Sequence, residues 1–178
     1  EEFRLKEKNL QSQWARKEKD LAEEYEQKMA DERRALEAEV VRLVIKRWKP
    51  AFGAELEGLV REEDAARERH QPNVWGRLAG EFHIRLARLS GNPLFVRMLE
   101  ELLPTTSLLM ALYKPPGEPM CVAHSHRVLL GKLEADSAAA AATEMRRHLN
   151  EIERSLDAPA ARATPALRDV FAPYREDA

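Results

Sequence analysis

Three histidines in this chain occupy positions from which their side chains could bind one metal ion. His83, His126 and His148 each lie among apolar residues at helical spacing, so each ring is expected on the buried side of a helix. Any one of them alone is typical of a hydrogen-bonded histidine at a core edge. Three in one small chain could bring neutral imidazoles together, where they bind Zn, Ni, Cu or Fe and leave a position open for water or a ligand.

The histidines need helices to position them, and the sequence predicts an all-α fold. Apolar residues recur with a helical period throughout, and no segment alternates with the two-residue period of a strand. We expect an antiparallel bundle of six to seven helices with a long N-terminal, coiled-coil-like helical extension. The expected helices span residues 2–48, 54–70, 74–90, 93–102, 106–113, 120–135 and 137–156, with a further short helix over 165–171.

Proline and glycine set the expected boundaries of these helices. Pro50 and Gly53 should break the first helix, and Asn73 should cap the third. The sequence Ser90-Gly91-Asn92-Pro93 predicts a helix end followed at once by a capped restart. Pro104 should interrupt the next helix, and the proline-rich segment 114–119 should be a loop.

Residues 1–32 differ in composition from the bundle that follows. Seventeen of these 32 residues are charged, and the sparse apolar residues repeat at an eleven-residue spacing, which predicts a nearly straight helix. This helix is either a solvated extension or a self-associating coil. We therefore divide the chain into a charged helical extension (1–32), a helical bundle (33–157) and an Ala/Pro-rich tail (158–178).

Bulk composition narrows the class of protein. A chain of 178 residues with 44% hydrophobic residues is long enough for one domain with a real core. The net charge of −2 predicts no nucleic-acid or anionic-membrane partner for this chain. One cysteine, Cys121, excludes an intramolecular disulfide and fits a reducing, cytoplasmic location. No apolar run is long enough for a membrane span, and no signal peptide is visible.

Several motifs follow one another along the chain. They are Arg33-Arg34-Ala35-Leu36-Glu37, Phe82-His83, Leu89-Ser90-Gly91-Asn92-Pro93-Leu94, His126-Arg127-Val128-Leu129-Leu130 and Met145-Arg146-Arg147-His148-Leu149. In order and spacing these motifs resemble the FCD domain, the C-terminal effector-binding domain of GntR-type (FadR-like) bacterial transcription regulators. The resemblance covers roughly residues 25–157.

The resemblance implies a helical bundle around a small carboxylate effector. In many family members a divalent metal is bound by an aspartate and three histidines, near an arginine on the first helix. Carried over, the histidines are His83, His126 and His148, and the arginine is Arg33. The family aspartate should stand four residues before His83, where this chain has Ala79. A three-histidine site for Zn or Ni, completed by water or effector oxygen, and a metal-free pocket are both open.

We therefore expect a non-enzymatic ligand-sensing and dimerisation domain that forms a homodimer. Residues 1–32 do not resemble the family's winged helix-turn-helix, so we expect no DNA binding by this chain itself. Either the sequence begins after the DNA-binding part, or the domain is joined, naturally or by engineering, to a coiled-coil stalk. The rival is a coiled-coil scaffold whose bundle has lost metal and effector. A hydrolytic enzyme is disfavoured, because no general base of suitable spacing accompanies the histidines.

Overall fold

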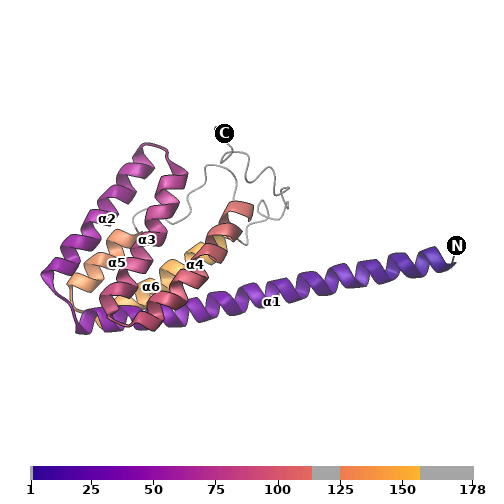
Figure 1. The fold of residues 1–178 in the computed structure, drawn as a ribbon, viewed down its shortest axis with the longest axis horizontal. Coiled ribbons are helices and arrows are strands. Elements are labelled where there is room, and N and C mark those ends of the chain that lie inside the picture. Colours follow the sequence, from indigo (N-terminus) through magenta and orange to yellow (C-terminus); the bar gives the residue numbers. More distant parts are fainter. Residues whose placement is uncertain (1, 114–124, 157–178) are drawn as a thin grey trace.

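The protein is a bundle of helices from which one long helix projects (Figure 1). The computed structural model describes residues 2–113 and 125–156, and within these ranges every regular element is a helix. The all-α prediction is therefore confirmed. The helices are α1 (Glu2–Lys46), α2 (Pro50–Glu68), α3 (Pro72–Ser90), α4 (Pro93–Tyr113), α5 (Ser125–Glu134) and α6 (Ala138–Leu156).

Helix α1 has two parts with different surroundings. From about residue 29 onward it packs in the bundle, most extensively against α6, and buries Leu36, Val40 and Val44. Before that point it extends away from the other helices (Figure 1). The predicted single helix over 2–48 is confirmed to within two residues at its C-terminal end.

Two predicted helix starts were wrong, and for the same reason. Helix α2 begins at Pro50 instead of residue 54, and α3 begins at Pro72 instead of residue 74. Proline at the first helical position has no N–H that needs a partner, and its fixed φ already suits a helix. Both prolines therefore start helices, and Asn73 lies inside α3 instead of capping it.

The predicted break at Pro104 was also wrong, because α4 continues through it to Tyr113. A proline inside a helix leaves the carbonyl four residues earlier without its backbone donor. Here both Pro104 and Glu100, which carries that carbonyl, lie on the solvent side of the helix. Water can solvate the freed group, so the helix loses one hydrogen bond without ending.

The tight turn between α3 and α4 follows the sequence prediction. Gly91 adopts the left-handed conformation with φ of 73°, and its N–H donates to the carbonyl of Arg88 at 3.0 Å. The Asn92 Oδ1 atom then accepts from the N–H of Leu94 at 3.0 Å, which caps α4 ahead of Pro93. The turn returns the chain antiparallel without a long loop.

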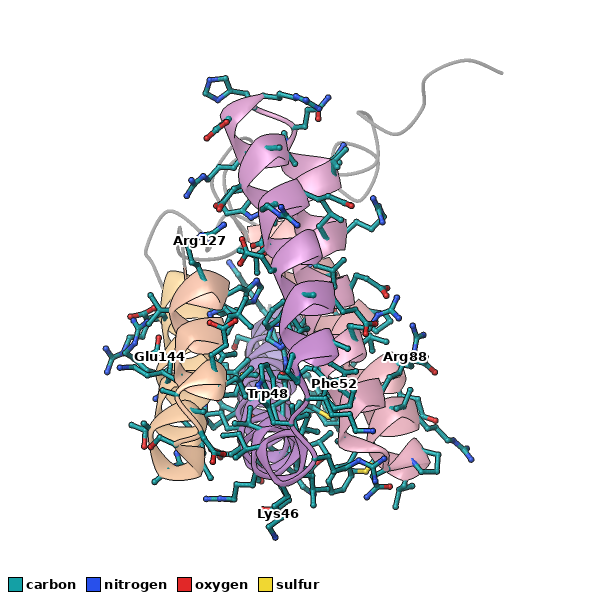
Figure 2. The ribbon with its side chains drawn as sticks, turned by 90° about the vertical axis from the view of Figure 1, so that its left-hand side faces the viewer. Lys46, Trp48, Phe52, Arg88, Arg127 and Glu144 are labelled. Carbon is teal, nitrogen blue, oxygen red and sulfur yellow. The ribbon has the colours of Figure 1, made fainter. Side chains whose placement is uncertain are left out.

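Aromatic and ionic contacts join the helices at their corners and outer faces (Figure 2). Trp48 and Phe52 meet edge to face, with ring centroids 6.3 Å apart, where α1 turns into α2. Arg127 of α5 donates to Glu57 and Asp64 of α2 at 3.2 and 2.8 Å. Because these ion pairs lie at the surface, each adds little to stability.

The remaining predictions about local structure lie outside the described residues. They concern the loop at 114–119, the first five residues of the helix expected over 120–135, and the tail with its helix over 165–171. None of the helices in the described part of the chain has the length and apolar character that crossing a lipid bilayer would require.

Gly91→Ala should lower the free energy of unfolding by about 1–2 kcal/mol, because an L-residue is strained in the left-handed region. The added Cβ would also lie 2.6 Å from the guanidinium carbon of Arg47, which would have to move. Gly58→Ala is the control, since its Cβ has nothing within 4 Å and the helix interior of α2 favours alanine by up to about 1 kcal/mol. Urea denaturation measures both, and equal effects would contradict the account of the turn.

Candidate metal centre

The structure brings the three predicted histidines together in the interior of the bundle. His83 comes from α3, His126 from α5 and His148 from α6, and all three are buried. Their Nε2 atoms form a nearly equilateral triangle with sides of 3.1, 3.2 and 3.3 Å. Three helices that are distant in sequence therefore direct their histidine Nε2 atoms at one point.

Each histidine faces inward because it belongs to the apolar face of its helix. His126 precedes the buried Leu129, Leu130 and Leu133 on α5, and its ring stacks on Phe82 with centroids 4.3 Å apart. His148 lies between the buried residues Met145 and Ile152 of α6 by the same spacing. Packing thus fixes the rings before any ligand binds.

A buried carboxylate on α1 orients the first ring. Nδ1 of His83 donates to Glu37 Oε2, and the other oxygen of Glu37 accepts from Nε of Arg33 at 2.6 Å. Both Arg33 and Glu37 are buried. Because Nδ1 carries the hydrogen toward Glu37, the Nε2 lone pair of His83 points into the triangle.

A second buried carboxylate, on α2, does the same for His126. Nδ1 of His126 donates to Glu63 Oε2 at 2.7 Å, and the other oxygen of Glu63 accepts from the indole N–H of Trp75 at 2.9 Å. Both oxygens of this carboxylate are therefore satisfied inside the bundle. The Nε2 atom of His126 is left as an acceptor, like that of His83.

Protonation states follow from burial and from these partners. Burial lowers the pKa of His83, and burial together with the neighbouring His126 holds the pKa of His148 well below its ordinary value. Burial alone would raise the pKa of Glu37, but the charges and hydrogen bonds of His83 and Arg33 lower it from 4.5 to about 2. At neutral pH His83 and His148 are therefore neutral imidazoles, and the carboxylate of Glu37 is ionised.

The triangle has the dimensions that a first-row divalent metal requires. Bonds of about 2.0–2.1 Å in a tetrahedral site place imidazole nitrogens about 3.3–3.4 Å apart, close to the separations seen here. In the described part of the chain, these three residues form a group whose ligand atoms lie within 4.8 Å of one another. A metal above the triangle would have three protein ligands and one side open.

Of the other predicted site residues, Arg33 lies close to the centre and Ala79 adds no ligand. Arg33 donates to Glu37, and Glu37 accepts from His83, so the guanidinium is linked to the imidazoles through Glu37. Ala79 is buried one turn before His83 on α3 and has no atom that could coordinate. A fourth ligand would have to come from elsewhere.

Sequence reasoning missed the orienting roles of Glu37 and Glu63. The signal was present, because both carboxylates interrupt apolar helix faces. Glu37 adjoins the buried Leu36 and Val40, and Glu63 follows Val60 by three residues on the face that α2 buries. A charged residue at a core position needs a buried partner, and histidine is one of the few that suit it.

Comparison with known families agrees with this fold. The family model of the FCD domain matches residues 28–151. The chain therefore belongs to the FCD family, the effector-binding domains of GntR-type transcription regulators, which are not enzymes. The matched segment contains all three histidines and both buried glutamates, and it begins close to the point where α1 enters the bundle. No curated protein matches the sequence significantly.

Glu63→Gln should weaken the binding of Zn²⁺ by about 10–100-fold while the protein stays folded. His126 and Trp75 donate to different oxygens of Glu63, and in the amide one of these two oxygens is replaced by an N–H₂ donor. Its N–H₂ group would favour the opposite His126 tautomer, with hydrogen on Nε2. Competition against a chromogenic chelator measures the affinity.

Glu57→Gln is the matched control, because it removes the same charge from α2 but contacts Arg127 at the surface. The orienting role of Glu63 would be wrong if both variants bound Zn²⁺ as tightly as the unaltered protein.

Proposed function

We propose that this chain is the ligand-sensing and dimerisation domain of a GntR/FadR-type transcription regulator. In this proposal His83, His126 and His148 hold a divalent metal, and a small carboxylate effector binds beside it, near Arg33. A regulator of this kind acts in the bacterial cytoplasm, and the domain itself has no catalytic task.

The observation that carries the proposal is the convergence of three buried Nε2 atoms. Burying three imidazoles against one another costs desolvation, and a hydrophobic core would avoid that cost. Two further carboxylates and a guanidinium are buried around them, so six polar groups are committed to one place. An all-nitrogen ligand set suits Zn or Ni better than Mg or Ca, which prefer oxygen.

Charge supports an anionic effector. A divalent cation and Arg33 together carry three positive charges, and Glu37 and Glu63 offset two of them. With Ala79 in place of an acidic ligand, one positive charge remains uncompensated and one coordination position stays open. A carboxylate supplies both the missing charge and the missing oxygen, and a nearby guanidinium favours it further.

Ala79 also supports the second candidate, a coiled-coil scaffold whose bundle no longer binds metal or effector. Without the acidic ligand, the three imidazoles could form a hydrogen-bonded core cluster in which one ring donates from Nε2 to another. The two candidates differ in metal content, which the following experiment measures.

Protein purified without a histidine tag and loaded with Zn²⁺ or Ni²⁺ should retain one equivalent of metal after gel filtration. Changing both His126 and His148 to alanine should abolish retention, because a single imidazole cannot hold the ion against buffer. His70→Ala is the control, since His70 is exposed on the α2–α3 turn. Elemental analysis gives the content and circular dichroism checks the fold. Absence of retained metal in the unaltered protein would favour the scaffold.

Small carboxylates should raise the midpoint of thermal unfolding of the metal-loaded protein, but not of the chelator-treated protein. A ligand at one hundred times its dissociation constant adds about 2.7 kcal/mol to the unfolding free energy. Arg33→Gln should reduce this shift by removing the nearby positive charge. Arg42→Gln, an α1 variant that loses a half-exposed ion pair with Glu39, should not. An equal shift in chelator-treated protein would contradict a metal-bound effector.

A further inference from the structure

The free part of α1 carries large apolar side chains that no other part of the described chain covers. They recur at alternating spacings of seven and four residues, which places them in one stripe along the helix. A helix that is surrounded by water normally exposes polar residues on all sides, so an apolar stripe of this length is unusual. The exposed fractions are 81% for Phe3, 56% for Leu10, 64% for Trp14, 58% for Leu21 and 60% for Tyr25.

The stripe is accessible to a second helix because it lies in line with the outer edge of α1 in the bundle. One of its two rows, Leu10 and Leu21, continues at the same eleven-residue spacing to the exposed Glu32 and the half-buried Leu43. The other row reaches Leu36, which is buried in the core of the bundle. A second helix could therefore lie on both rows over residues 3–28, whereas only the row of Leu10 and Leu21 stays accessible where α1 enters the bundle.

Charges on the two sides of the stripe are opposite. On one flank the same position of the eleven-residue repeat is occupied by Lys6, Lys17 and Lys28. On the other flank the corresponding position is occupied by Glu7 and Glu18. In a parallel pair of identical helices, one flank of each helix faces the opposite flank of the other. In an antiparallel pair, like flanks face each other.

Charge complementarity therefore favours the same helix of a second copy as the partner, and it favours a parallel orientation of the two helices. We propose that residues 3–28 of α1 form a parallel, two-stranded coil with the same segment of a second copy of this chain. The apolar stripes form the interface, and each lysine flank faces the partner's glutamate flank. An antiparallel pair would set lysine against lysine, which disfavours it. The eleven-residue period makes the two strands nearly straight.

The consequence is a dimer whose two bundles lie at the same end of the coil. Glu37, which contacts His83, and Arg33, which contacts Glu37, are on the same continuous helix as the stripe. This pairing surface lies outside the bundle and does not depend on metal or effector binding.

A single cysteine at position 10, in a Cys121→Ser background, tests the orientation. In a parallel, in-register coil the two copies of residue 10 face each other, so mild oxidation should convert Leu10→Cys protein to a covalent dimer. An antiparallel pair would separate these positions along the helix, and a monomer would leave them unlinked. Failure to form the disulfide, with the helix intact by circular dichroism, would overturn the proposal.

Charge reversal tests the pairing rule in the same cysteine background. Changing Lys6, Lys17 and Lys28 to glutamate should suppress cross-linking of that variant alone, because both flanks become acidic. Mixing it with the Glu7→Lys, Glu18→Lys variant should restore covalent dimers, which are then mixed dimers. Lys8→Glu with Arg16→Glu is the control, because these exposed residues lie on the face away from the stripe. If the charge variants cross-linked as well alone as when mixed, the parallel arrangement would be overturned.

Discussion

The hydrogen bonds from His83 to Glu37 and from His126 to Glu63 are the constraint on which the interior of this bundle depends. Ionised carboxylates are costly to bury, and they are tolerated only where their oxygens find donors. Here each carboxylate has two: Arg33 and His83 for Glu37, Trp75 and His126 for Glu63. The same bonds decide which nitrogen of each ring faces the centre. The hydrogen bonds that satisfy the buried carboxylates therefore also direct the Nε2 atoms of His83 and His126 at the centre.

This network also links helices that are far apart in sequence. Glu37 connects α1 to α3, Glu63 connects α2 to α3 and α5, and His148 brings in α6. A ligand that pulled on the imidazoles would act on all of these helices through short, buried contacts. Helix α1 is continuous from the centre to its exposed end (Figure 1), so a displacement of Glu37 has a direct mechanical route outward.

Much of this structure could be predicted from residue spacing, and the failures have a physical pattern. Helical periodicity located the six described helices, and the apolar neighbours of His83, His126 and His148 placed all three in the core. Errors arose at Pro50 and Pro72, which begin helices because proline suits the first helical position, and at Pro104, where the freed carbonyl faces water. The carboxylate partners were missed because they come from other helices, and single-chain periodicity does not show which faces meet.

Two carboxylates hold His83 and His126 with hydrogen on Nδ1, which leaves the Nε2 lone pairs directed at the centre. Long-range proton–nitrogen correlation spectra of chelator-treated protein report the tautomer of each ring directly. The account predicts an unprotonated Nε2 and a protonated Nδ1 for both residues at neutral pH, with assignments from single-histidine variants. Nε2-protonated tautomers, or doubly protonated rings, at His83 and His126 would contradict it.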